Sequence, residues 1–260
     1  MMKQDDQNYC IRQARARDYD RYIATLAAPS ALRGYLSVLL AFNDEIARVR
    51  DTVSEPALGD IRLTWWREAV NEAALGTAKE HPIARALAVT LQTRDVDPHY
   101  LHNMIDARAR DLDDAPFATL EELEKYADAT SGNLSLAMLD VLGVKEDAAQ
   151  TAARQSGTAW ALIGMLRALP HHRRAGRQFI ARDIEVSTIA RRAEDLVIAA
   201  RGLSRQVPRQ TNAALLSNRI ADIYKAQLMA ADGDVEKADF EISQLKKAAT
   251  VLWHKVLGRY

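Results

Sequence analysis

Apolar residues recur at steps of three and four positions along most of this chain, which is the spacing of residues on one face of an α-helix. The clearest case follows Pro29, where Ser30 is a suitable N-cap for the helix that comes next. The apolar face of this helix consists of Leu32, Tyr35, Leu36, Leu39, Leu40 and Ile46. The pattern predicts a core helix that gives way to a turn near Asp51.

Comparable patterns predict further helices over residues 15–27, 58–75, 82–94, 98–113, 119–142, 145–169, 188–205, 211–231 and 239–257. Pro82 and Thr119 suit helix starts, and Gly143 suits a helix stop. The sequence contains neither the alternation typical of strands nor a repeat of fixed period. We therefore predict a single all-α domain at residues 15–260, with roughly ten helices around a central cavity, preceded by a flexible N-terminus at residues 1–14.

Composition and charge limit the classes of function that this chain can have. The 260 residues are 48% hydrophobic, and 35 Lys plus Arg balance 35 Asp plus Glu, so the formal net charge is zero. Such a chain has no overall field that would draw it to nucleic acid, and any anion binding must be local. The single Cys10 cannot form an internal disulfide, which fits a reducing compartment. Neither a signal peptide nor an apolar run of membrane-spanning length is found, so we expect a cytoplasmic protein, peripheral to the inner membrane at most.

The last predicted helix is amphipathic and basic. Its apolar stripe is formed by Leu245, Ala249, Leu252 and Val256, and its other side carries Lys246, Lys247, His254, Lys255 and Arg259. Such a stripe commonly packs on the core while the charged face is solvated. Helices that lie on membrane surfaces share the same pattern, and both interpretations stay open at this stage.

Five segments follow one another in an order and spacing that resemble the squalene/phytoene synthase family. They are Leu40-Ala41-Phe42, Leu63-Thr64-Trp65-Trp66-Arg67-Glu68, Tyr126 to Gly132, Leu166-Arg167 and Gly176-Arg177-Gln178-Phe179-Ile180. The resemblance implies a single-domain isoprenoid (terpenoid) synthase fold. For catalytic members it also implies head-to-head joining of two prenyl diphosphates, with Mg²⁺ held by two aspartate-rich motifs. Such hard cations prefer carboxylate oxygens and neutralise the diphosphate leaving group.

The first aspartate motif of the family falls on residues 47–51, where a single acid remains. The segment reads Ala47-Arg48-Val49-Arg50-Asp51. Two like charges about 4 Å apart repel by on the order of 4 kcal/mol at an effective dielectric constant of about 20. The two arginines therefore disfavour a divalent cation at this position.

The second motif falls on residues 168–172 and contains no acid. It reads Ala168-Leu169-Pro170-His171-His172. No metal site is predicted here, because the adjacent histidines lack the Cys or acid partners that zinc requires. The resemblance implies that the residues at cavity or motif positions are Ala47, Asp51, Tyr126, Ala168 and His172.

Acids elsewhere in the chain are an alternative source of metal ligands. Each is expected to be solvated or in an ion pair, because most aspartates are exposed. Asp128, two residues after Tyr126, is expected to face solvent, since a buried carboxylate without a partner is unfavourable. Asp44 shares a helix face with Asp51, but seven residues rise about 10.5 Å, too far for both to hold one ion. The remaining alternative ligands are Asp106, Asp113, Asp114 and Asp183.

A second set of segments resembles the branch of this family that contains the mitochondrial respiratory complex I assembly factor. It comprises Phe42-Asn43, residues 50–55, Trp66, residues 105–106, 112–114, 120–127 and 167–174. That branch keeps the fold and lacks the paired aspartate motifs. The resemblance implies a pseudoenzyme without a cofactor, whose partner is a complex I subunit or assembly intermediate.

The basic segment at residues 171–177 has chemistry of its own. Guanidinium groups present forked donors that suit phosphate, so arginines here and upstream could hold an anion such as a prenyl diphosphate or a phospholipid without metal. The simpler interpretation is a solvated basic loop. The candidate anion-binding residues are Arg48, Arg50, Arg167, Arg173, Arg174 and Arg177.

Two functions from different classes follow. The first is a non-catalytic scaffold in the assembly of respiratory complex I, with an anion- or lipid-binding cavity retained from the fold. The alternative is a divergent head-to-head prenyltransferase, in which Asp51 and displaced acids hold Mg²⁺. Three or more carboxylates converging beside Asp51 and His172 would favour the enzyme.

Overall fold

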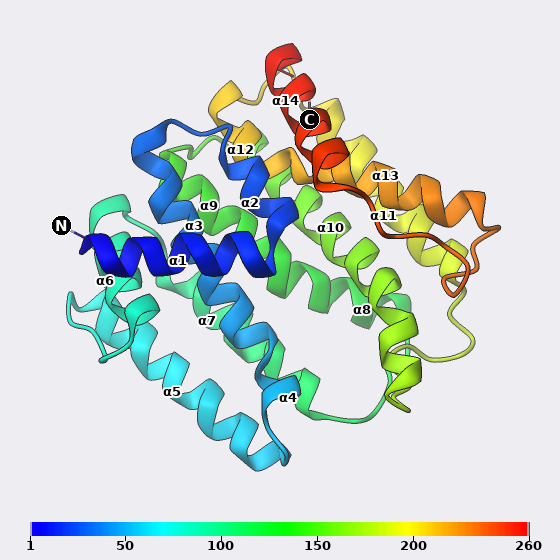
Figure 1. The fold of residues 1–260 in the computed structure, drawn as a ribbon, viewed down its shortest axis with the longest axis horizontal. Coiled ribbons are helices and arrows are strands. Elements are labelled where there is room, and N and C mark those ends of the chain that lie inside the picture. Colours follow the sequence, from blue (N-terminus) through cyan, green and yellow to red (C-terminus); the bar gives the residue numbers. More distant parts are fainter. Residues whose placement is uncertain (1, 259) are drawn as a thin grey trace.

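A computed structural model describes residues 2–258 and 260 of the chain. Figure 1 shows helices throughout. The first half contains α1 (Gln4–Arg17), α2 (Tyr19–Thr25), α3 (Ser30–Ala47), α4 (Val49–Thr52), α5 (Pro56–Ala74), α6 (Pro82–Arg94), α7 (Pro98–Arg108) and the 3₁₀ turn η1 (Ala109–Leu112). The second half contains α8 (Leu120–Ala127), the π-helical turn η2 (Asp128–Gly132), α9 (Asn133–Leu142), α10 (Asp147–Arg174), α11 (Val186–Gly202), η3 (Arg209–Thr211), α12 (Asn212–Leu215), α13 (Ser217–Ala230) and α14 (Gln244–Leu257).

The prediction of an all-α fold is confirmed. Within the described residues, β pairing is limited to one isolated bridge between Phe117 and Ile180. Helices α3, α9 and α10 lie at the centre, with α1, α5, α6 and α7 on one side and α11 and α13 on the other (Figure 1). The predicted apolar face of α3 is the reason for its central place, because Leu36, Leu39 and Leu40 are all fully buried.

Helix boundaries follow the local signals closely. Pro82 is the first residue of α6, where its missing N–H would have had no helical partner. The Thr119 hydroxyl caps α8 by accepting a hydrogen bond from the Glu122 N–H at 3.1 Å. Gly143 ends α9 with a φ of 72°, a left-handed conformation that glycine adopts without strain.

The N-terminal segment differs from the prediction of a flexible stretch at residues 1–14. Its residues form most of α1, which packs against α3 and α6. Cys10 is fully buried in this contact, and Asp6 is joined to Arg85 of α6 by an ion pair of 2.6 Å. The sequence pattern did not predict this packing, because α1 has few apolar residues. The helix is instead fixed by small buried side chains and by the ion pair of the buried Asp6 carboxylate.

The helix predicted at 145–169 is longer than expected and replaces the predicted basic loop. Helix α10 continues through Pro170 to Arg174. It ends where Gly176 takes a φ of 70° and the Arg177 N–H donates to the His172 carbonyl at 2.9 Å. A proline inside a helix removes one backbone hydrogen bond and its ring crowds the carbonyl four residues earlier, yet α10 remains helical past Pro170. The strong stop signal of the glycine therefore sets the boundary.

Several predicted helices are interrupted and one is shorter. The 15–27 helix is divided at Asp18 between α1 and α2, and the 98–113 helix passes from α7 into the 3₁₀ turn η1. The 119–142 helix contains the π-helical turn η2, and the 211–231 helix is divided into η3, α12 and α13. The last helix begins after Ser243, whose hydroxyl accepts from the Lys246 N–H at 3.3 Å, rather than at residue 239. The breaks at η2 and at η3–α12 place polar side chains in the buried part of the fold, namely Thr130, Ser131, Thr211 and Asn212.

The apolar stripe of α14 does not pack on the core, contrary to the simpler sequence interpretation. Leu245 is 81%, Leu252 61% and Val256 72% exposed, whereas Val251 on the opposite side is 5% exposed. Helix α14 is held through Val251 and Lys247, so its basic side is the side that packs in part. Among the described residues, no helix combines the length and apolarity needed to cross a bilayer.

Candidate functional site

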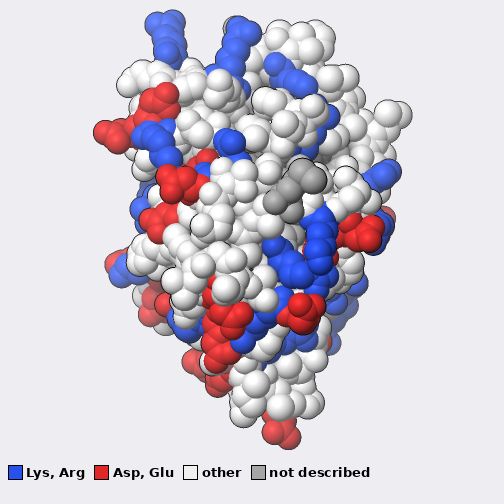
Figure 2. All heavy atoms as spheres, turned by 90° about the vertical axis from the view of Figure 1, so that its left-hand side faces the viewer, with Lys and Arg blue, Asp and Glu red and all other residues white. Residues whose placement is uncertain are grey.

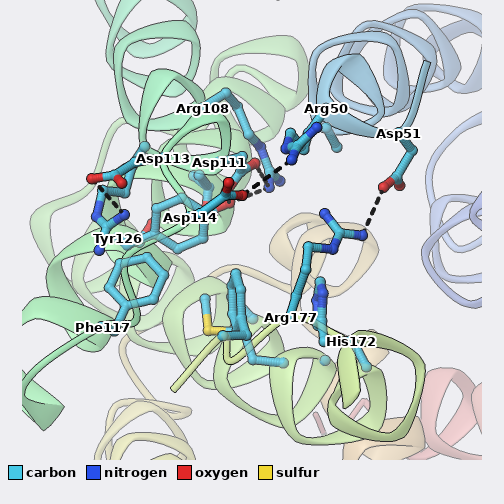
Figure 3. Close-up of a pocket in the computed structure, with 18 of the residues that line it drawn as sticks. Arg50, Asp51, Arg108, Asp111, Asp113, Asp114, Phe117, Tyr126, His172 and Arg177 are labelled. Atoms are coloured by element: carbon cyan, nitrogen blue, oxygen red, sulfur yellow. Dashed lines mark hydrogen bonds and ion pairs between the residues drawn. The ribbon is translucent and has the colours of Figure 1, made fainter. Parts of the chain in front are cut away.

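A cavity of about 300 Å³ lies between the ends of α3 and α4, the α7–η1 segment, the η2 turn, the C-terminal half of α10 and the segment after it. Its inner part is lined by Phe117, Trp160, Met165 and Phe179. Figure 3 shows charged side chains from α4, η1 and the segment after α10 pointing toward one another across the outer part. The cavity is therefore apolar inside and charged at its mouth.

The structure places all five sequence-predicted cavity positions on this surface. They are Ala47, Asp51, Tyr126, Ala168 and His172. Residues from the two motif segments, far apart in the chain, thus face one space. The short side chains of Ala47 and Ala168 leave room at the two places where the family resemblance expects acids.

The six predicted anion-binding arginines do not act together. Only two of them line the cavity, Arg50 and Arg177. Arg174 is exposed, and Arg173 pairs with Glu236 at 3.1 Å, away from the cavity. The remaining two have other partners: Arg48 pairs with Asp44 at 3.5 Å, and the Arg167 guanidinium lies 3.6 Å from the ring centroid of Tyr224.

Two ion pairs cross the mouth of the cavity. Arg177, just after α10, lies 3.2 Å from Asp51 of α4, so it connects the first motif segment with the chain that follows the second. Arg50 lies 3.1 Å from Asp114, which follows η1. Both contacts are drawn in Figure 3. The one acid left in the first motif is therefore neutralised by an arginine.

A buried polar cluster forms one wall of the cavity. The Tyr126 hydroxyl donates a hydrogen bond to Asp111 at 2.6 Å and accepts one from Arg108. Arg108 also pairs with Asp111 at 3.2 Å. Burial raises the pKa of Tyr126 well above its usual value, so the phenol stays protonated at neutral pH.

Sequence reasoning missed Arg108, Arg110 and Asp111 as cavity residues. The signal that could have found them is the three-residue spacing of Arg108 and Asp111 in a charge-rich segment at the end of a predicted helix. That spacing places the two side chains on one helix face, where they reach the Tyr126 hydroxyl.

His172 lies flat against an aromatic wall. Its ring stacks on Phe179 with centroids 4.5 Å apart and an interplanar angle of 5°. Burial lowers the pKa of His172, and the charge of Arg177 lowers it further. The imidazole is therefore neutral at pH 7 and adds no positive charge to the mouth.

The carboxylates of the cavity do not form a cage suited to Mg²⁺. Asp111, Asp113 and Asp114 join Asp51 in lining it, but each has an arginine partner; Asp113 pairs with Arg110 at 3.3 Å. Within the part of the chain that the structure describes, no three His, Cys, Asp or Glu side chains are placed to hold a metal ion. A dication here would have to displace the arginines from their carboxylates.

The other acids considered as alternative ligands lie outside the cavity. Asp106 pairs with Arg67 and Asp183 is exposed. Burial raises the pKa of Asp44, which faces Arg48. Asp128, expected to face solvent, is half-buried and held by Arg154 at 2.6 Å. This arginine supplies the partner that a buried carboxylate requires.

The fold agrees with the comparisons to known proteins. A family model described as squalene/phytoene synthase matches residues 14–185, and the chain belongs to this family. A dehydrosqualene synthase crystal structure superimposes with a TM-score of 0.80 over 98% of this chain and 96% of that chain, at 18% identity. At that identity the likeness concerns the fold, and it confirms the predicted isoprenoid synthase architecture.

Two relatives of this chain are named as complex I assembly factors rather than as synthases. The chain is 35% identical over 176 residues to mouse "NADH dehydrogenase (ubiquinone) complex I, assembly factor 6", covering 68% of this chain and 53% of that protein. It is 33% identical over 177 residues to the human protein of the same name, with 68% and 53% covered. The predicted resemblance to this branch is confirmed. The chain spans about half the length of these relatives.

Proposed function

We propose that this protein is a non-catalytic member of the squalene/phytoene synthase family that acts in the assembly of respiratory complex I. The observation that carries the proposal is the pairing of Asp51 with Arg177 and of Asp114 with Arg50. The similarity to proteins named complex I assembly factor 6 supports complex I assembly as the process in which the protein acts. The partner is then a complex I subunit or assembly intermediate.

Charge is the physical reason for excluding prenyl transfer as the main role. A diphosphate leaves readily only when several cation charges neutralise it, and Mg²⁺ needs free carboxylates to be held there. The carboxylates at this mouth instead neutralise arginines. Four aspartates and four arginines line the cavity, and these formal charges cancel.

The same geometry favours metal-free binding of a phosphate-bearing amphiphile. Arg50 and Arg177 are forked donors at the mouth, and the aromatic inner part suits an apolar chain. In this proposal Asp51 and Asp114 hold the two arginines in place until the ligand phosphate replaces them. A prenyl diphosphate and a phospholipid share this chemistry.

The assembly role is tested by deleting the gene in the organism that carries it. We expect NADH:ubiquinone oxidoreductase activity and the amount of assembled complex I to fall together, and to recover with the wild-type gene. Normal complex I content in the deletion strain would overturn the assembly role. Comparing strains that carry the wild type and R50Q/R177Q then shows whether the cavity arginines serve this role.

The proposed absence of prenyl transfer is tested separately. Purified protein is incubated with farnesyl or geranylgeranyl diphosphate and Mg²⁺, and the lipid extract is analysed for head-to-head C30 or C40 products. We expect none. Formation of such a product, abolished by Asp51→Ala, would establish the alternative function, a divergent prenyltransferase using Mg²⁺, which is favoured only by the four aspartates that share this cavity.

The proposed place of action is the cytoplasmic face of the inner membrane, where the protein would be peripheral. In this proposal the scaffold must reach the membrane surface. The chain's neutral net charge gives no general attraction to acidic lipid, and a local surface must supply it.

A further inference from the structure

Helix α14 presents an apolar stripe to solvent on a protein that otherwise buries such stripes. Leu245, Leu252 and Val256 are 81%, 61% and 72% exposed. Ala249 continues the same line at a helical spacing of three and four residues. We call these four residues the α14 outer face.

Basic residues flank the α14 outer face on both sides. By the 100° step of a helix, Lys246 lies beside it on one edge and Lys255 on the other, and both are exposed. The segment Gln244–Leu257 contains no aspartate or glutamate. A helix that merely needed solubility would carry acids as well, so this composition points to an anionic partner.

Trp253 marks one border of the stripe. It is 64% exposed and adjoins the α14 outer face on the Lys246 side. Leu26, 38% exposed at the end of α2, extends the apolar area on the other side, where the Lys255 ammonium donates to the Leu26 carbonyl at 3.3 Å. An exposed tryptophan between apolar and basic residues is the arrangement that favours the boundary between lipid headgroups and acyl chains.

The opposite side of α14 is fixed to the body by a buried charge cluster. Lys247 lies 2.8 Å from Asp20, which also accepts a hydrogen bond from the Tyr224 hydroxyl at 2.5 Å. Arg167 lies 3.7 Å from the same carboxylate. These contacts hold the helix in one rotation, so its apolar stripe cannot turn inward.

The C-terminal half of α14 lies away from the acidic residues of the connection that precedes this helix. Figure 1 shows this end at the upper end of the molecule, with the connection that precedes the helix lower down. That connection contains Asp239 and Glu241. In Figure 2 the uppermost charged side chains are Lys and Arg, and acidic ones lie below them.

We propose that the α14 outer face docks on the surface of a bilayer that contains anionic lipid. The apolar stripe enters the headgroup region, and Lys246 and Lys255 contact lipid phosphates. A second copy of this chain is a poorer occupant, because an isologous contact would place lysines of two acid-free helices opposite each other. The proposal deepens the peripheral location proposed above by naming its surface and lipid class.

The test uses the full chain and vesicles of phosphatidylcholine with about one third phosphatidylglycerol, compared with phosphatidylcholine alone. We expect co-sedimentation with the anionic vesicles that is weakened by salt, and a blue shift of tryptophan emission that is lost in Trp253→Phe. K246Q/K255Q should lower the partition coefficient by on the order of tenfold, since each basic residue near such a surface contributes about 1 kcal/mol. L252E/V256E should abolish binding.

The matched controls are Leu75→Glu, at a position 82% exposed on another helix end, and Lys125→Gln, an exposed lysine of α8. Both should bind as wild type, and unchanged thermal unfolding shows that all variants fold. Absence of vesicle binding, equal binding to phosphatidylcholine alone, or a concentration-dependent dimer lost in L252E/V256E would each overturn the proposal. The complex I content of a deletion strain tests the assembly role separately, so failure of one is distinguishable from failure of the other.

Discussion

The guanidinium of Arg177, five residues after the second motif segment, lies 3.2 Å from the carboxylate of Asp51 at the end of the first. The two residues are 126 positions apart in the chain. Asp51 therefore serves as the counter-ion of an arginine, and both groups line a cavity that also has aromatic walls.

Removing this counter-ion should improve anion binding. We expect Asp51→Asn to raise the affinity for inorganic pyrophosphate, without Mg²⁺, by up to about fivefold, because a solvent-exposed ion pair contributes about 0–1 kcal/mol. Isothermal titration calorimetry measures the change. Glu121→Gln, which breaks the exposed pair with Lys125, is the control and should leave affinity unchanged. Weaker binding in Asp51→Asn would contradict the exchange of carboxylate for phosphate.

Loss of the arginines should have the reverse effect. R50Q/R177Q removes both forked donors at the mouth and should weaken pyrophosphate binding at least about tenfold, since charge-assisted hydrogen bonds are the stronger ones. Arg174→Gln changes an exposed arginine of the same sequence segment outside the cavity and should bind as the wild type. Equal losses in both variants would mean that the basic segment attracts anions without a defined site.

The Tyr126 hydroxyl should matter for stability more than its single oxygen atom implies. Tyr126→Phe leaves Asp111 and Arg108 short of a hydrogen-bond partner in a buried place, and we expect a loss of about 1–3 kcal/mol in the free energy of unfolding. Urea denaturation followed by circular dichroism measures it. Tyr22→Phe, at a half-buried tyrosine that does not line the cavity, is the comparison. A variant as stable as wild type would show that the cluster adds nothing.

The same tyrosine predicts how stability changes in alkali. Burial raises the folded-state pKa of Tyr126 above the unfolded value of about 10. Above pH 10 the unfolded state therefore holds fewer protons than the folded state, and the stability from this group falls as pH rises. Between pH 8 and about 11, the free energy of unfolding should decline less steeply in Tyr126→Phe than in the wild type. Parallel curves would mean that this phenol does not contribute.

The contact between α1 and α6 should be sensitive to acid. The hydrogen bonds that Arg85 donates to Asp6 lower the pKa of this carboxyl. A depressed folded-state pKa gives stability that is present above about pH 4 and is lost as pH falls toward the folded value. Asp6→Asn should lose about 1–3 kcal/mol at pH 7 and much less near pH 3.

Thermal unfolding at the two pH values tests this directly. Asp5→Asn changes the neighbouring exposed aspartate and should have the same melting temperature as the wild type at both pH values. If Asp6→Asn lowers the melting temperature equally at both pH values, the ionised carboxylate is not the source of the stability.

Local patterns predicted most elements of this fold because helix signals act within a few residues. Pro82 and Thr119 fix helix starts through their own backbone or side-chain groups, and Gly143 fixes a stop. Ser30, predicted as an N-cap, is instead the first residue of α3, and Pro29 occupies the cap position without a side-chain hydrogen bond. The errors occurred where distant contacts outweigh local signals. Helix α1 has few apolar residues, and it is ordered by contacts with α3 and α6, including the ion pair with Arg85.

The sequence by itself determined the all-α class, the family and the loss of acids at both motif positions, because residue identity and spacing are written in the chain. It also named five of the positions that line the cavity. The tertiary structure alone decided that Arg177 pairs with Asp51 and Arg50 with Asp114, while Arg48 and Arg167 find partners elsewhere. It also decided that the stripe of α14 faces solvent. Helical periodicity defines which residues share a face, but the direction in which that face points is set by the packing of neighbouring helices.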